Sequence, residues 1–154
     1  MSNAKARLLE MIEDDLADIE AALKENLTPQ LDLVTRVSGH ILFAGGKRLR
    51  PLLVVLCAKL CGYSGEDIKS FATIMEYLHA ATLLHDDLID GAAVRRGKTA
   101  AHCSFGNSIA VLVGDFLLAR SLAIAAGAGR IEIVKIMADV TETMAQGEIQ
   151  QLIY

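Results

Sequence analysis

Aromatic residues and prolines are scarce in this sequence. Its 154 residues include no tryptophan, two prolines and 5% aromatic residues, although 53% are hydrophobic. The hydrophobic residues are chiefly alanine, leucine and isoleucine, and few turn-forming residues separate long periodic stretches. This composition favours a helical bundle over a sheet protein. The length suits one domain with a substantial core, so we assign residues 1–154 to a single domain.

Cysteine is also scarce, with three residues, Cys57, Cys61 and Cys103, in apolar sequence surroundings. No histidine near Cys57 and Cys61 completes a metal-binding set. We therefore interpret the three as reduced, buried thiols of a cytoplasmic protein.

Positive charge and long uninterrupted apolar runs are lacking too. The net charge of −4 argues against a general nucleic-acid binder. Acidic residues recur from Glu10 onward, so the N-terminus has no apolar signal region. Charged residues interrupt the most apolar stretches, namely Lys59, Asp115 and Arg120. We therefore expect no integral membrane segment.

Hydrophobic residues recur at spacings of three and four along most of the chain, which predicts amphipathic helices. The expected helices cover about 9–23, 29–44, 51–62, 65–90, 108–126 and 130–154, with a polar loop at 91–107. Pro29 is expected to open the second helix, and Ser64 with Asp67 to form a capping box before the fourth. No stretch alternates with period two, so the fold class is all-α, an antiparallel helical bundle.

The fourth helix carries the first candidate site. His79, Leu83, Asp86 and Asp90 fall on one narrow stripe at 100° per residue, and Asp87 lies to one side. Two carboxylates one turn apart can share a Mg²⁺ ion, which binds one or two carboxylates and fills its other positions with water and phosphate. The alternative is an exposed acidic face, although the apolar neighbours of these residues favour a largely buried helix.

Two basic segments accompany this helix in the sequence, at 47–50 and 95–98. Three cations within 47–50 repel one another unless an anion neutralises them, and the preceding Gly45-Gly46 lets a ligand approach the backbone. The spacing differs from a P-loop. Each segment is alternatively a solvated loop, but together they suggest a phosphate site.

The chain resembles the trans-isoprenyl (polyprenyl) diphosphate synthase family in five motifs, in both their order and their spacing. They are GGKRLRP (45–51), HAATLLHDDLID (79–90), RRGKTAAH (95–102), FGNSIAVLVGDFLLARS (105–121) and GEIQQL (147–152). The similarity runs from about residue 30 to the end and suggests the N-terminal half of such an enzyme, closest to octaprenyl-type synthases. The resemblance implies an isoprenoid-synthase bundle, of which this chain holds roughly the first six helices.

The resemblance also implies site roles. Asp86, Asp87, Asp90 and Arg95 correspond to the catalytic residues that hold the allylic diphosphate, with Asp86 and Asp90 as direct ligands of magnesium. The isopentenyl diphosphate would be bound by a second set of residues: Lys47, Arg50, His79 and Arg96, with Arg95 nearby on the allylic side.

The implied activity is a head-to-tail condensation of an allylic prenyl diphosphate with isopentenyl diphosphate, with Mg²⁺ as cofactor, in a cytoplasmic homodimer. The apolar helix at 108–126 is a candidate dimer interface or, equally, a core helix. Ala81 and Thr82 are small where a bulky aromatic would shorten the product in this family. Tyr77, farther down the same helix, is the third residue expected to influence product length. We therefore expect a long-chain product.

The family's second aspartate-rich motif has no counterpart in this sequence. We therefore expect a fragment of a long-chain synthase that is inactive alone. The alternatives are a non-catalytic diphosphate-binding subunit of a heteromeric synthase, or a related terpene synthase. The GGKRLRP segment argues against the terpene synthase, since a cyclase needs no isopentenyl site.

Overall fold

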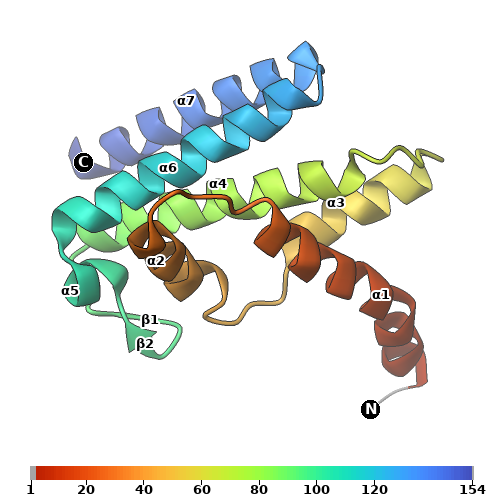
Figure 1. Cartoon of the computed structure of the whole chain (residues 1–154), viewed down its shortest axis with the longest axis horizontal. Helices are drawn as coiled ribbons and strands as arrows, with labels where there is room; N and C mark the ends of the chain where they lie inside the picture. Colours follow the sequence, from red (N-terminus) through yellow and green to blue (C-terminus); the bar gives the residue numbers. More distant parts are fainter. Residues whose placement is uncertain (1–2, 154) are drawn as a thin grey trace.

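The chain folds into long helices with one short hairpin (Figure 1). A computed structural model describes the backbone of residues 3–153 and the side chains of residues 12–153. The elements are α1 (Asn3–Glu25), α2 (Asp32–Leu42), α3 (Leu49–Leu60), α4 (Ile68–Ile89), β1 (Val94–Arg95), β2 (Lys98–Thr99), α5 (Ala101–Phe105), α6 (Asn107–Gly127) and α7 (Ile131–Ile153). The helical class predicted from the sequence is confirmed.

Helix α4 lies at the centre of the bundle. It packs against α1, α2, α3, α5 and, most extensively, α6, which runs along it in Figure 1. Its buried residues include Tyr77 and Leu84, which join Leu117 of α6 and Leu23 of α1 in the main core. Burial of these large side chains holds the helices together and fixes α4, which carries the acidic stripe.

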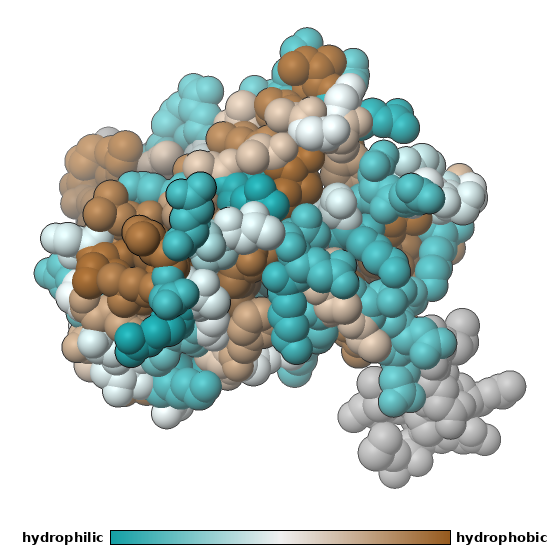
Figure 2. All heavy atoms as spheres, viewed as in Figure 1, coloured by the Kyte–Doolittle hydropathy of each residue, from teal (hydrophilic) through white to brown (hydrophobic). Residues whose placement is uncertain are grey.

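Helix α7 packs along α6 and is mostly exposed. A small cluster of Ile74, Ala125 and Met137 joins it to the bundle. Large apolar side chains remain exposed along it, including Ile136, Ile149 and Leu152. Figure 2 shows hydrophobic surface on the upper part of the molecule, where Figure 1 places α7.

The six helices expected from the sequence correspond to α1–α4, α6 and α7, with three corrections. Helix α2 begins at Asp32 rather than Pro29, and its acidic first residue suits the helix N-terminus. The capping box is wrong, because α4 begins at Ile68 with Asp67 as its N-cap, and no side chain caps the helix. Asp67 instead accepts a hydrogen bond of 3.4 Å from the hydroxyl of Tyr63. The loop at 91–107 contains the β1–β2 hairpin and α5.

The prediction of buried cysteines is also wrong. Cys57, Cys61 and Cys103 are all exposed and reduced. The face of α3 that enters the core carries Leu52 and Val55 instead. Apolar neighbours in sequence did not reveal which face of a short helix is buried.

Among the described residues, one helix is long and apolar enough to cross a membrane by length and composition. It is α6, whose most apolar window is 33% buried in this chain. Core helices of globular proteins satisfy the same criterion, so the absence of a membrane segment stays a prediction.

Candidate functional site

Four residues that the sequence analysis grouped together line one cavity. Lys47, Arg50, His79 and Arg96 surround a volume of about 300 Å³ between the α2–α3 loop, α4 and the hairpin. Lys47, Arg50 and Arg96 are exposed, and within the described part of the chain they form no salt bridge. Three unneutralised cations around one cavity create a positive potential that suits a polyanion. We call this cavity the basic pocket.

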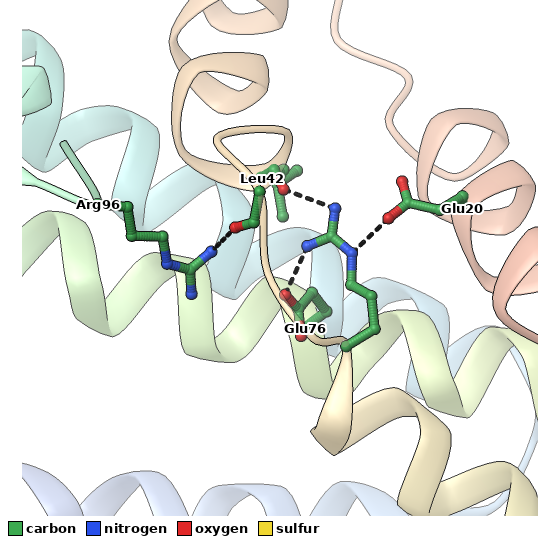
Figure 3. Close-up of polar contacts among 6 residues, drawn as sticks. Glu20, Leu42, Glu76 and Arg96 are labelled. Atoms are coloured by element: carbon green, nitrogen blue, oxygen red, sulfur yellow. Dashed lines mark hydrogen bonds and ion pairs between the residues drawn. The ribbon is translucent and has the colours of Figure 1, made fainter. Parts of the chain in front are cut away.

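The hairpin brings Arg96 to the basic pocket. Arg96 and Gly97 form its two-residue turn, with φ of 52° and 77°, and positive φ at both positions is typical of a type I′ turn. The guanidinium of Arg96 donates a hydrogen bond to the carbonyl of Gly45 and packs against Gly46 (Figure 3). His40 contacts the carbonyl oxygen of Thr99 at 2.8 Å and so ties the hairpin to α2.

Arg48 lies between two pocket cations in sequence, yet its side chain is buried. It donates hydrogen bonds to Glu20 at 2.5 Å, to Glu76 at 2.8 Å and to the carbonyl of Leu42 at 2.7 Å (Figure 3). Burial by itself would lower the pKa of Arg48, but its bonds to the two carboxylates offset this and leave the pKa raised. Thus one of the three cations at 47–50 is neutralised within the chain, which sequence spacing could not show.

His79 is half-buried beside these cations, and its pKa is lowered. Desolvation is the largest cause, followed by the positive charge of Arg50, with smaller contributions from Arg96 and Arg95. The imidazole is therefore held in its neutral form more strongly than in water. A bound anion would offset the charge of the neighbouring cations and raise the pKa of His79.

The two predicted magnesium ligands differ in their exposure to solvent. Asp86 is half-buried and Asp90, which follows the last residue of α4, is exposed. The pKa of Asp86 is raised, first by desolvation and then by the negative charges of Glu148 and Asp90. Carboxylates that repel one another in this way are suited to share a cation.

Asp87 points away from these two and is 1% exposed. Its Oδ1 accepts hydrogen bonds from Nε of Arg95, at 2.7 Å, and from Nη2 of Arg95. The hydrogen bond to Asp87 is the main cause of the raised pKa of Arg95. Among the described residues, Oδ2 of Asp87 has no hydrogen-bond partner. The structure therefore joins two predicted site residues through a buried ion pair.

A second cavity, of about 340 Å³, lies between α4, α6 and α7 on the other side of the acidic stripe. Ala81 and Thr82 line it, as predicted, and Asp86 and Glu148 are among its few charged residues. Most of the remaining lining is apolar: Leu78, Ile89, Leu118, Met144, Ala145, Ile149 and Leu152. We call it the apolar groove. Its apolar lining suits a hydrocarbon chain, and Asp86 lies where a charged group attached to that chain could be bound.

Tyr77 does not line this groove. Its side chain is fully buried and its hydroxyl donates a 2.6 Å hydrogen bond to the carbonyl of Leu23 in α1. Burial raises its pKa. The structure thus places Tyr77 in the core, and its position does not support the predicted role in product length.

The sequence analysis missed the contact between His85 and Gly114. The Nε2 atom of His85 lies 3.2 Å from the carbonyl oxygen of Val111 and 3.4 Å from Oδ1 of Asp115. A Cβ atom on Gly114 would lie only 2.3 Å from that nitrogen. The glycine therefore lets the ring beside Asp86 pack against α6, but the motif gave no hint of this pairing.

The described residues contain no group of three or more His, Cys, Asp or Glu side chains that could hold a metal. Magnesium does not require one, because it is commonly bound by one or two carboxylates with water and substrate phosphate. Desolvation first, and then the charges of Glu148 and Asp90, raise the pKa of Asp86, and a cation bound at this carboxylate would offset these effects. These residues are therefore compatible with Mg²⁺ delivered together with a phosphate.

Comparison with known proteins agrees with this geometry. The polyprenyl synthetase family model matches residues 31–154. Octaprenyl diphosphate synthase of Escherichia coli is 37% identical over 146 residues, which are 95% of this chain and 45% of that protein. Heptaprenyl diphosphate synthase component 2 of Geobacillus stearothermophilus is 36% identical over 141 residues, which are 92% of this chain and 44% of that protein.

A solved structure is similar as well. Polyprenyl synthase from Caulobacter crescentus, complexed with calcium and isoprenyl diphosphate, matches with a TM-score of 0.89 and 37% identity, over 96% of this chain and 45% of that one. The helical bundle is thus an isoprenoid-synthase fold, and the chain belongs to the polyprenyl synthetase family. It spans under half the length of the curated relatives that it matches.

Proposed function

We propose that this chain supplies the substrate-binding half of a prenyltransferase that condenses isopentenyl diphosphate with an allylic prenyl diphosphate. The observation that carries the proposal is the arrangement on α4. This helix contributes His79 to the basic pocket and Ala81 to the apolar groove, with Asp86 at the groove and Asp90 one turn further along. One helix thus serves a polyanion site and a hydrocarbon site.

The basic pocket is the proposed site for the diphosphate of isopentenyl diphosphate. Lys47 supplies a mobile ammonium group, and Arg50 and Arg96 supply planar guanidinium groups that match phosphate oxygens. Desolvation and then the charge of Arg50 lower the pKa of His79 in the free chain, and a bound anion would favour its protonated form. This set carries enough positive charge to neutralise most of a diphosphate.

The groove is the proposed site for the allylic substrate. Its hydrocarbon chain would lie along Ala81 and Leu118, with its diphosphate near Asp86. Asp86 and Asp90 would hold magnesium, which would supply the positive charge that helps the diphosphate depart. Arg95, fixed by Asp87, would add a further positive charge.

The chain's own residues then orient the reaction and exclude water. The allylic C–O bond breaks and its electron pair leaves with the diphosphate, after which the isopentenyl double bond attacks the allylic carbon. Loss of a proton to the released diphosphate restores a double bond. Side chains of the groove exclude water from the cationic carbon, so no nucleophilic side chain is needed.

The small side chains of Ala81 and Thr82 favour a long product, because they leave the groove open beside α4. The Escherichia coli relative is named for an octaprenyl product. A homodimer and a cytoplasmic location complete the proposal. The exposed Leu112 and Leu122 on α6 support association through that helix.

A second candidate is a diphosphate-binding subunit of a heteromeric synthase. The Geobacillus relative is named as one component of an enzyme. The exposed apolar face of α7 would then be covered by a partner chain. Neither candidate predicts turnover by this chain alone, because the second aspartate-rich motif is missing from its sequence. The added protein that restores turnover distinguishes the two.

Equilibrium dialysis with labelled isopentenyl diphosphate tests the basic pocket. Lys47→Gln and Arg50→Gln should each weaken binding about ten-fold or more by removing one charge near the phosphates. Lys98→Gln, in the hairpin that carries Arg96 but outside the pocket lining, is the matched control. Equal affinities for all four proteins would overturn the assignment.

Turnover is tested by adding farnesyl diphosphate and magnesium and resolving the labelled products by length. Elongated product that disappears in Asp86→Ala would show that this chain suffices. Product that forms only after a partner protein is added would favour the heteromeric candidate.

A further inference from the structure

Glu76 places a negative charge in the lining of the basic pocket, which is proposed to bind an anion. It is a carboxylate in the lining of a cavity whose other charged groups are cations. Its side chain is 8% exposed, so water would screen it poorly and an unneutralised carboxylate there would repel a diphosphate. The negative charge of Glu76 already acts on His79, whose pKa it raises against the larger opposing effects.

Arg48 forms an ion pair with Glu76 and offsets its negative charge. Its Nη1 atom lies 2.8 Å from Oε1 of Glu76, and its side chain is 5% exposed. The same guanidinium binds Glu20 of α1, which at 39% exposure can be screened by water. Figure 3 shows the guanidinium between the two carboxylates and the Leu42 carbonyl, with Arg96 on the other side of the loop. Arg48 thus lines the pocket beside Glu76 and pairs with it there.

The backbone conformation at Arg48 allows its side chain to reach Glu76. Its φ of 49° places it in the left-handed region, which is uncommon for a residue other than glycine. That turn directs the side chain inward, while Lys47 and Arg50 on either side stay exposed. A conformation that is strained for arginine persists because the buried bonds of the side chain hold it.

We propose that Arg48 is a positioning residue that neutralises Glu76, and that the Arg48–Glu76 pair sets the anion affinity of the basic pocket. This inference rests on the proposed diphosphate site. The proposed effect is electrostatic. The charges of Arg48 and Glu76 sum to zero in the native chain, and a substitution that changes this net charge alters the affinity for the anion without changing the shape of the pocket.

Four proteins separate charge from structure. Relative to the native pair, Glu76→Gln adds one positive charge and Arg48→Met adds one negative charge. The double variant Arg48→Met/Glu76→Gln returns the sum to zero without the ion pair. If the net charge of the pair sets the affinity, Glu76→Gln should bind pyrophosphate most tightly. The native chain and the double variant should bind about ten-fold more weakly, and Arg48→Met about ten-fold more weakly again. A purely structural role for Arg48 predicts instead that Glu76→Gln gains nothing and that the double variant binds no better than Arg48→Met.

The experiment is calorimetric titration of inorganic pyrophosphate into each protein at pH 7.5, with helicity checked by circular dichroism. Arg48→Lys keeps the charge and should bind within a few-fold of native, which covers the case in which Arg48→Met unfolds. Recovery of affinity in the double variant and tighter binding by Glu76→Gln are the expected results. A native chain that binds pyrophosphate while Glu76→Gln binds no tighter overturns the inference alone. A native chain that binds no pyrophosphate overturns the proposed site as well.

Discussion

Arg95 donates two hydrogen bonds to the same oxygen of Asp87, so the hairpin is fastened to the middle carboxylate of the acidic helix. Asp87 is buried and its charge is already paired. Asp86 and Asp90 remain accessible. This division supports Asp86 and Asp90 as metal ligands and gives Asp87 the task of positioning Arg95.

Removing Arg95 should destabilise the fold. Arg95→Met would leave Asp87 buried without its partner and should lower the free energy of unfolding by about 2–3 kcal/mol, below the range for a fully buried pair because Arg95 is 32% exposed. Urea denaturation measures this. Asp87→Asn in the same chain should restore part of the loss. A decrease no larger than that of Lys98→Met would contradict the structural role of the pair.

Asp86 should lower the stability of the metal-free protein at neutral pH, although it contributes to magnesium binding. Its pKa is raised in the folded chain, so its contribution to stability is present below the unfolded pKa and is lost as the pH rises through the folded value. At pH 7 Asp86→Asn should therefore raise the melting temperature of the metal-free protein. Magnesium with pyrophosphate should stabilise the native chain more than this variant. Identical magnesium effects in both proteins would argue against a ligand role.

His79 should take up a proton when an anion binds. Cations and desolvation lower its pKa in the free chain, and a bound pyrophosphate would offset the cations and raise it. Histidine NMR titrations with and without pyrophosphate measure the change. His40, bonded to Thr99 outside the pocket lining, is the internal control. An unchanged pKa at His79 under saturating pyrophosphate would place the anion elsewhere.

Gly114 should tolerate no side chain. Gly114→Ala brings a methyl group against the His85 ring and should destabilise the chain by about 1–3 kcal/mol, as overpacking does. Gly147→Ala, on a helix with open space around the added methyl, should instead stabilise by about 0.5–1 kcal/mol. His85→Ala should relieve much of the strain in Gly114→Ala. Additive losses in the double variant would show that the two residues do not share this contact.

Filling the groove should shorten the product. Ala81→Phe places an aromatic ring in the apolar groove and should stop elongation after fewer isopentenyl additions, because the growing chain meets the ring. Ala17→Phe, exposed on α1, is the matched control. Products are resolved by chain length with farnesyl diphosphate as primer, with the partner protein that restores turnover present in every reaction. An unchanged distribution for Ala81→Phe would remove the groove from the path of the chain.

Much of the helical architecture could be predicted from periodicity, and the motifs located most of the site. Lys47, Arg50, His79 and Arg96 come together as the resemblance implied, because each motif sits at a fixed place on the bundle. Helix starts were less predictable: an N-terminal proline and a Ser–Asp pair gave plausible boundaries, but the tertiary environment of each segment decided the actual ones.

Contacts between distant residues could not be predicted. Glu20 and Glu76 each lie 28 positions from Arg48 in sequence, and nothing in local spacing links them. Tyr77 shows the opposite error, since its place on α4 suggested the groove while its hydroxyl bonds to α1. Which face of a central helix meets which neighbour depends on packing of the whole bundle, and one sequence does not specify it by periodicity alone.

The most direct test of the central claim locates the metal. Manganese, a paramagnetic substitute for magnesium, is added with pyrophosphate to the ¹⁵N-labelled chain, and broadening of each amide signal is recorded. The account predicts the strongest broadening around Asp86 and Asp90, weaker broadening in the α2–α3 loop, and its loss at both aspartates in Asp86→Asn/Asp90→Asn. Broadening centred instead on the acidic residues of α1, unchanged in that double variant, would contradict it.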